Sequence, residues 1–416
     1  MLKDKNLVFV FPYRGTGGVS LLFLRLAEYI GQNFKDDFKG IYLVDFEDGF
    51  MAKNKKDPSI QLIPYSDDQI EIPEQAIMIY QSMTPWTIFK NFNYKQDTRI
   101  LFWNCHPFNL VPTFPGLREL MGKSRKFSRF AFSTFLFTFK NTCVNFLRLL
   151  ENKSAIVFVD GPNVTNTEAY LGLRIHNPFY LPIFLGQDQF VGNEVSRAKD
   201  ELHFGWVGRV VDFKFFILKH TLERLEKLSA KSGQKIKFTV VGTGDYIGQL
   251  KDAVKTFNHL EIEFIDHIGP SELTGFIKEL DILFAMGTSA LEGGAAKVPT
   301  VLLDFTYGEL EQDYIFKFLY ESQNFSVADY IGSEHYQNNN TSLDTIVDEV
   351  LRRKEVHGQK CYEYVSKNHS IDVIYKKFVL AVMNTQLTYS NLQEANLLRV
   401  PLVYRIFKKV RALIKG

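Results

Sequence analysis

Between residues 203 and 305, short apolar runs alternate with helical patterns at close and regular intervals. The apolar runs are 203–210, 236–242, 262–269, 281–287 and 299–305. Strands that alternate with helices form a parallel sheet with helices on both faces, and ligands bind at the carboxyl ends of its strands. This stretch therefore predicts a doubly wound α/β domain. Within it, Ser271 is expected to be the N-cap of a helix over 271–280.

The N-terminal half has the same alternation in a less regular form. Strands are expected at 6–12, 40–46, 75–82, 98–106 and 154–161, with a basic, phenylalanine-rich helical region at about 117–150. A chain of 416 residues suits two domains of about 200 residues each. We therefore predict an α/β fold of two Rossmann-like doubly wound domains facing each other across a cleft, over 1–190 and 191–385, followed by a tail over 386–416.

Composition excludes several classes of protein. The net charge of +2 gives no indication of nucleic-acid binding. Cys105, Cys143 and Cys361 lie far apart, which suggests neither a zinc site nor a disulfide framework and fits a reducing cytoplasm. The N-terminal apolar run is too short for a signal peptide, and the most apolar segment, 129–150, is interrupted by polar residues. We expect a cytoplasmic protein.

The stretch "FPYRGTGGVS" at 11–20 joins the first expected strand to the first expected helix. Glycines such as Gly17 and Gly18 let the backbone approach a ligand, and a helix N-terminus attracts an anion, so this is a phosphate-binding layout. Ser20 replaces the last glycine of the dinucleotide fingerprint, and no Gly-Lys-Ser/Thr follows. A tight turn without a ligand is the alternative.

Two cations follow the strand at 203–210. Arg209 ends the strand and Lys214 opens the next helix. At a helix entrance, a guanidinium and an ammonium five residues apart can bind a diphosphate. The alternative is a solvated surface pair.

The turn after the fourth strand offers a second anion site. Gly287, Thr288 and Ser289 present backbone N–H groups and two hydroxyls, and Glu292 lies about one turn into the helix, where it can reach ribose hydroxyls. The small residues at 293–296 allow the helix to pack closely on the sheet. The alternative is an ordinary helix start with an acidic residue nearby.

These motifs together resemble a known family. Gly208 and Arg209 with Lys214, followed about 80 residues later by "LEGGAAKVPTVL", are similar to the donor-site signature of retaining GT-B glycosyltransferases, in particular family four. The Gly-Gly-Val at 17–19 is also typical of that family. The resemblance implies a UDP- or GDP-linked sugar as donor. The implied donor-binding residues are Gly17, Gly18, Arg209, Lys214, Gly287, Thr288, Ser289 and Glu292.

The resemblance also implies a mechanism. His106, just past the fourth N-terminal strand, corresponds to a histidine that reaches the donor sugar and the reaction centre, although a structural histidine is the alternative. The leaving phosphate accepts the proton of the acceptor, so no separate protein base is assigned. No metal or other cofactor is expected, because cations and N–H groups stabilise the leaving diphosphate.

The chain departs from the family at two places. The first of the two glutamates that the family usually has, eight positions apart, falls on Phe284, and "YLPIF" at 180–184 replaces a frequent Asn-Gly turn. The absence of this glutamate leaves open a degenerate GT-B protein that binds a nucleotide-sugar or a partner enzyme without catalysis. A nucleotide-sugar epimerase is a further alternative, although no convincing pair of acid and base carboxylates is found.

Two basic segments point to a membrane surface. The segment 118–148 mixes cations with phenylalanines, and 396–416 is basic and amphipathic. Cations attract anionic headgroups while an apolar face inserts shallowly, although each segment can instead pack on the core of the protein. With the resemblance, we expect a bacterial enzyme, peripheral on the inner face of the cell membrane, that extends a lipid-linked or oligosaccharide acceptor in polysaccharide biosynthesis.

Overall fold

The chain forms two compact units. The computed structural model describes residues 2–15, 17–111, 137–190, 201–310, 314–333, 336, 339, 341–401 and 404. Unit 1 comprises Met1–Pro182 and Ile374–Gly416, and unit 2 comprises Ile183–Val373. The predicted domain boundaries lie after residues 190 and 385. In the structure the chain passes from unit 1 to unit 2 after residue 182 and returns to unit 1 after residue 373.

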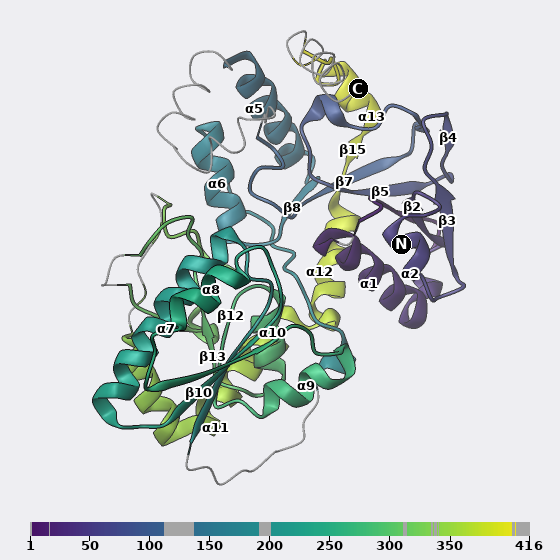
Figure 1. Cartoon of the computed structure of the whole chain (residues 1–416). Helices are drawn as coiled ribbons and strands as arrows, with labels where there is room; N and C mark the ends of the chain where they lie inside the picture. Colours follow the sequence, from purple (N-terminus) through teal and green to yellow (C-terminus); the bar gives the residue numbers. More distant parts are fainter. Residues whose placement is uncertain are drawn as a thin grey trace. The chain divides into compact units, whose positions relative to one another are not determined.

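Unit 2 is built on a six-stranded sheet that is parallel except for its last strand (Figure 1). Its strands are β9 (Leu202–Val207), β10 (Ile236–Val241), β11 (Leu260–Ile265), β12 (Ile282–Ala285), β13 (Thr300–Leu302) and β14 (Lys317–Phe318). The spatial order is β11-β10-β9-β12-β13-β14. The chain therefore reverses its direction of winding between β9 and β12, which is where open α/β sheets bind ligands.

Helices connect these strands, as the sequence predicts for 203–305. They are α7 (Asp212–Ser232), α8 (Ile247–Val254), α9 (Pro270–Lys278) and α10 (Thr288–Ala295), followed by the long α11 (Leu343–His369). The predicted cap of α9 is wrong. Gly269 is the N-cap, and Ser271 lies inside the first turn. Proline is favoured at the first helical position, because its fixed φ suits the helix and the N–H at that position forms no hydrogen bond within the helix. Pro270 therefore starts the helix one residue before the predicted cap.

The central strands of the unit 2 sheet, β9 and β12, are buried on both faces. Phe204, Trp206 and Phe284 belong to the core cluster on one face, and Leu283 and Ala285 belong to the cluster on the other. Neighbouring residues of a strand point to opposite faces, so a strand covered on both sides reads as a continuous apolar run. This explains why the strands of unit 2 are easy to recognise in the sequence.

Unit 1 has a seven-stranded sheet with the same winding. Its strands are β1 (Asn6–Val10), β2 (Gly40–Asp45), β3 (Ile60–Pro64), β5 (Ala76–Gln81), β7 (Arg99–Asn104), β8 (Ile156–Phe158) and β15 (Leu387–Thr388). The order β3-β2-β1-β5-β7, with β8 beside β7, reverses between β1 and β5. The five strands expected from the sequence are confirmed, whereas β3 and β15 were not predicted. The short β4 (Ile70–Glu71) and β6 (Phe92–Asn93) form a separate pair.

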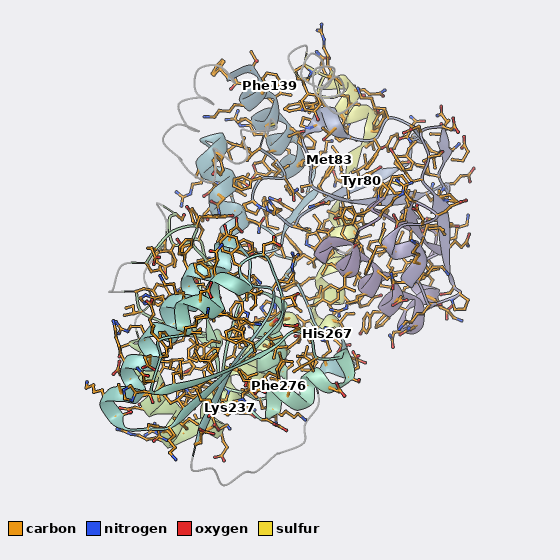
Figure 2. The ribbon with its side chains drawn as sticks, in the orientation of Figure 1. Tyr80, Met83, Phe139, Lys237, His267 and Phe276 are labelled. Carbon is orange, nitrogen blue, oxygen red and sulfur yellow. The ribbon has the colours of Figure 1, made fainter. Side chains whose placement is uncertain are left out.

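The helices of unit 1 are α1 (Gly18–Asn33), α2 (Phe50–Asn54), α5 (Phe137–Asn152), α6 (Gly161–Leu171), α12 (Ile371–Asn384) and α13 (Tyr389–Glu394). Tyr80 of β5 and Phe139 of α5 belong to its core (Figure 2). The C-terminal segment completes this unit: the ring of Phe378 on α12 stacks on Phe9 at 5.7 Å. No helix of the described residues has the length and apolarity needed to cross a membrane.

Candidate functional site

In unit 2, the loops that follow β9 and β10 are joined by backbone hydrogen bonds. The N–H of Gly208 donates to the carbonyl of Val241 and that of Val210 to Thr243, both at 2.9 Å. Gly242 and Gly244 have φ of 137° and 150°, and a Cβ on either would lie 2.3 and 2.2 Å from the carbonyl oxygens of Gly208 and Val210. Only glycine fits at these two positions, and the resulting close contact fixes the loop that carries Arg209.

Lys214 is held in an unusual environment. It is half-buried at the start of α7, with Nζ 5.5 Å from the ring centroid of Trp206 and 5.8 Å from that of Phe213. Burial, together with the nearby charge of Arg209, lowers the pKa of Lys214 below its ordinary value of 10.5. No carboxylate of the described residues pairs with either cation. Two close cations that form no ion pair with a described carboxylate can bind an anion.

A pocket of about 530 Å³ surrounds the two cations. Its described lining residues are Arg209, Val211, Asp212, Phe213, Lys214, Asp245 and Tyr246. The structure therefore brings the predicted Arg209 and Lys214 into one cavity. Asp245 and Tyr246 were not predicted, although the Gly-Thr-Gly that precedes them, directly after a strand, is a detectable signal.

The N-terminus of α10 lies at the end of β12, the neighbour of β9. Gly287 is its N-cap with φ of 67°, Thr288 is exposed, and Ser289 is half-buried. Among the described residues, none of 287–292 lines the pocket of Arg209 and Lys214. Residues 287–292 are placed near this pocket only by the parallel pairing of β12, which precedes them, with β9, which precedes Arg209.

Glu292 lies in the second turn of α10 and is half-buried. Its Oε1 accepts a hydrogen bond from Nε2 of Gln189 at 3.4 Å. The expectation of close packing is confirmed, because a Cβ on Gly293 would lie 2.4 Å from Oγ1 of Thr300. Phe284 lies within β12, fully buried beside the rings of Phe204 and Phe238, so its side chain cannot contact a ligand.

In unit 1, Gly17 is the N-cap of α1 and Gly18 its first residue. A Cβ on Gly18 would meet no atom within 4 Å, so the space beside it is open. The buried carboxylate of Asp45 anchors the preceding loop, since Oδ1 accepts from the N–H of Tyr13 at 2.8 Å. Oδ2 accepts from the N–H of Met51 at 2.7 Å, which fixes the loop on α2.

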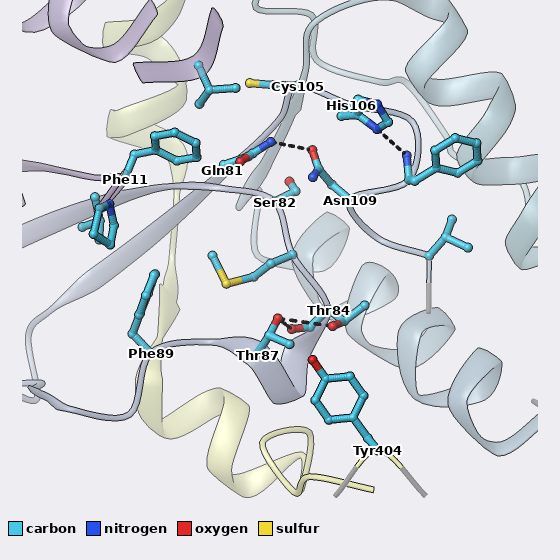
Figure 3. Close-up of a pocket in the computed structure, with 16 residues that line it drawn as sticks. Phe11, Gln81, Ser82, Thr84, Thr87, Phe89, Cys105, His106, Asn109 and Tyr404 are labelled. Carbon is cyan, nitrogen blue, oxygen red and sulfur yellow. Dashed lines mark hydrogen bonds between the residues drawn. The ribbon is translucent and has the colours of Figure 1, made fainter. Parts of the chain in front are cut away.

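His106 lines a second pocket, also of about 530 Å³, that opens between β1 and β5 where the winding of unit 1 reverses (Figure 3). Val19, which follows Gly18, lines it too. Nδ1 of His106 accepts a hydrogen bond from the N–H of Phe108 at 3.2 Å. The neutral ring therefore carries its proton on Nε2, which makes His106 a hydrogen-bond donor.

Several polar residues of this second pocket were not predicted. They are Gln81, Ser82, Thr84, Thr87 and Asn109. Most of them follow β5 directly, and a strand order of the Rossmann type would have identified that strand end as the binding edge. Among the described residues, no three His, Cys, Asp or Glu side chains are grouped so that they could hold a metal ion.

The two basic segments are only partly described. Residues 112–136 and most of the tail, 402–403 and 405–416, lie outside the described residues. The described end of the first segment forms α5, whose apolar face is buried in unit 1 through Phe139, Phe146 and Leu147. For this part the structure supports the alternative of packing on the core of the protein.

The fold is similar to that of solved glycosyltransferases. A glycosyltransferase from Rickettsia africae has 13% identity, covers 91% of this chain and 98% of its own, and has a TM-score of 0.56. An Escherichia coli trehalose-6-phosphate protein bound with UDP-2-fluoro glucose has 12% identity, coverages of 92% and 99%, and a TM-score of 0.53. The apo lipopolysaccharide outer core galactosyltransferase WaaB has 10% identity, coverages of 92% and 100%, and a TM-score of 0.51.

At these identities the similarity shows the fold. The predicted α/β fold of the GT-B type, with two Rossmann-like domains, is confirmed, and so is the resemblance to GT-B glycosyltransferases. No family model and no curated protein matches the sequence.

Proposed function

We propose that the chain is a glycosyltransferase that moves a sugar from a UDP- or GDP-linked donor to a lipid-linked or oligosaccharide acceptor, with retention of anomeric configuration and without a metal. It acts in bacterial cell-surface polysaccharide biosynthesis, on the cytoplasmic side of the membrane. The observation that carries the proposal is the pair of cations Arg209 and Lys214, which form no ion pair with a described carboxylate and line one pocket at the carboxyl ends of β9 and β10. Asp212 and Asp245 line the same pocket.

The proposed chemistry follows from charge. Cleavage of the sugar–phosphate bond leaves a nucleoside diphosphate, whose growing negative charge must be stabilised. Arg209 can bind two phosphate oxygens in a bidentate manner, and Lys214 supplies a point charge made stronger by partial burial. The N–H groups at the starts of α10 and α1, which include those of Thr288, Ser289, Gly17 and Gly18, add dipoles of the right sign. The N–H of Gly287 donates to the carbonyl of Val327 at 2.9 Å, so the proposal gives it no role in binding the diphosphate.

In unit 1, His106 donates through Nε2 to an oxygen of the transferred sugar. In unit 2, Glu292 binds donor hydroxyls and is oriented by Gln189. The leaving phosphate takes the proton of the acceptor hydroxyl, so the proposal assigns no protein base. Membrane attachment rests on the basic sequence of 118–136 and 405–416. The described start of the tail, like α5, packs on the core of unit 1, through Leu397, Leu398 and Tyr404.

The experiment is a transfer assay with UDP- and GDP-sugars and a panel of glycolipid and oligosaccharide acceptors. We expect Arg209→Ala to lower kcat/KM by about 100-fold or more, the effect of removing one group that stabilises a developing anion. Arg352→Ala, an exposed residue on α11, is the matched control and should retain activity. Full activity of a folded Arg209→Ala variant would refute the site.

Phe284 supports a second candidate, a protein that binds a nucleotide-sugar without transferring it. The position that the resemblance assigns to a donor-binding glutamate is occupied by a buried phenylalanine. Tight binding of one nucleotide-sugar, with neither transfer nor hydrolysis over the whole acceptor panel, would favour this candidate.

A further inference from the structure

The described lining of the unit 1 pocket carries no formal charge. None of its described lining residues carries a carboxylate, an ammonium or a guanidinium group, and the titratable ones are Cys105, His106 and Tyr404. Burial raises the pKa of the Cys105 thiol well above its ordinary range, so that group stays neutral. A ligand with a formal charge would lose its hydration here without gaining a counter-charge, which is unfavourable.

Ser82 is a buried serine in the lining of this pocket. The residue is 1% exposed, and among the described residues its Oγ forms no hydrogen bond. Leaving a buried hydroxyl unpaired is unfavourable, so native proteins rarely do so without a reason. Because Ser82 lines the pocket, a bound ligand can supply the missing partner.

A pair of amides lies beside Ser82 (Figure 3). Nε2 of Gln81 donates to Oδ1 of Asn109 at 3.2 Å. This bond orients both groups and leaves Oε1 of Gln81 as an acceptor and Nδ2 of Asn109 as a donor. Hydroxyl groups, which donate and accept at once, match such a pair.

The rest of the lining is largely apolar. Phe11, Met83, Phe89 and Phe108 contribute rings and a thioether, while the hydroxyls of Thr84 and Thr87 lie at the far end (Figure 3). The volume of about 530 Å³ falls in the range of small-molecule sites, about 300–1,000 Å³. A sugar ring can form hydrogen bonds to the polar residues through its uncharged hydroxyls and can pack its apolar C–H faces on the aromatic rings.

We infer that this pocket binds an uncharged sugar ring of the acceptor and discriminates against uronic acids, free amino sugars and sugar phosphates. The inference rests on the proposed function, whose acceptor it narrows to a neutral glycoside. Gln81, Ser82 and Asn109 are the residues that determine this specificity.

The test is ligand-observed NMR on the full chain with methyl glycosides of glucose, galactose, mannose and N-acetylglucosamine, each compared with charged analogues: the glucuronide, the glucosaminide and the 6-phosphate. We expect at least one neutral glycoside to bind about tenfold more tightly than its charged analogues, a difference of about 1.4 kcal/mol. Equal or tighter binding of the charged analogues, or no binding of any sugar, would overturn the inference.

Two pairs of variants locate the binding. Gln81→Glu places a charge in the pocket and should weaken neutral glycoside binding about tenfold, whereas Gln61→Glu, on the exposed face of β3, should not. Ser82→Ala should weaken binding while leaving the melting temperature equal or higher, because an unpaired hydroxyl is removed. Ser66→Ala on the surface is its control. Unchanged binding in both pocket variants would place the sugar elsewhere.

Binding of UDP and GDP, followed in parallel, reports on the unit 2 pocket. If neither nucleotide binds while a neutral glycoside does, the proposed function fails and the sugar site stands. If a nucleotide binds but the sugars show no preference for neutrality, only the present inference fails.

Discussion

At the scale of one residue, Lys214 is placed in a way that favours ligand binding over the stability of the free protein. A half-buried ammonium beside a guanidinium, with no carboxylate partner among the described residues, destabilises the free protein. An anion that enters the pocket removes this penalty. The same arrangement therefore predicts a pH dependence of binding.

The lowered pKa of Lys214 means that the free protein loses this proton at a lower pH than an ordinary lysine does. A bound diphosphate favours the charged form, so binding takes up a proton, and affinity should fall as pH rises above the pKa of Lys214, by up to tenfold per pH unit. In Lys214→Arg, whose guanidinium does not titrate, the affinity should change little over the same range.

Calorimetric titration of methyl diphosphate between about pH 8 and 10, above its last phosphate pKa, measures this effect without a nucleobase that titrates in the same range. Lys231→Arg, an exposed residue at the end of α7, is the control and should keep the pH dependence of the native chain. An equal pH dependence in Lys214→Arg would mean that Lys214 does not contact the anion.

The sequence predicted Arg209, Lys214 and His106 because each follows a recognisable strand. It did not predict Tyr246 or Ser82. Tyr246 lines the same pocket as the cations only because β10 pairs with β9, and Ser82 lines the same pocket as His106 only because β5 pairs with β7. Strand order is a long-range property, and local residue patterns do not contain it.

At the scale of elements, the paired loops after β9 and β10 depend on glycine. Gly244→Ala would place a Cβ 2.2 Å from the carbonyl oxygen of Val210 at a φ of 150°. We expect it to lower the free energy of unfolding by roughly 1–3 kcal/mol and to weaken nucleotide binding. Gly248→Ala in α8, where a Cβ meets nothing within 4 Å, should instead be neutral or stabilising. Urea unfolding of both variants provides the comparison, and equal stabilities would contradict it.

Helix α7 buries a neutral histidine. Burial, with smaller contributions from Arg224 and Lys227, lowers the pKa of His220 from 6.5 to about 4. Between these values the unfolded chain binds a proton that the folded chain does not, so the free energy of unfolding should fall as pH falls from about 6.5 to about 4.

Unfolding midpoints at several pH values test this expectation. His220→Leu should show a weaker loss of stability over this interval than the native chain, whereas His259→Leu, at an exposed position, should lose stability as the native chain does. The same pH dependence in His220→Leu as in the native chain would show that His220 is not the group responsible.

Elements were predictable where burial on both faces made a strand continuously apolar, as in β9, β10 and β12. The strand β3 was missed, since its sequence "IQLIP" contains an exposed Gln61 and ends in a proline. The two-residue strands β14 and β15 are too short to leave a pattern. The cap of α9 was misplaced because a serine was preferred over the glycine that precedes Pro270.

At the scale of the whole molecule, unit 1 is formed by two separate segments of the sequence, whereas unit 2 is formed by one continuous segment. The C-terminal segment returns to unit 1, where Thr385 Oγ1 donates to the carbonyl of Ile100 at 2.6 Å and β15 pairs with β7. The sequence gives no local sign of this return, which is why the predicted second domain extends to 385.

Unit 2 contains its own sheet and two core clusters, so we expect the segment 183–373 to fold when expressed alone and to bind the same nucleotide as the full chain. Circular dichroism and calorimetry would test this, with the full chain as control. A segment that folds cooperatively but binds no nucleotide recognised by the full chain would show that the donor site needs unit 1.

The measurement that tests the central claim most directly is the thermal stabilisation of the full chain by nucleoside diphosphates and their sugars, in the native protein and in Arg209→Ala. A ligand that binds only the folded state at 100 times its Kd stabilises it by about 2.7 kcal/mol. The account predicts a clear rise in melting temperature with UDP or GDP, lost in Arg209→Ala and kept in Arg352→Ala. No rise with any nucleotide, or an equal rise in Arg209→Ala, would contradict it.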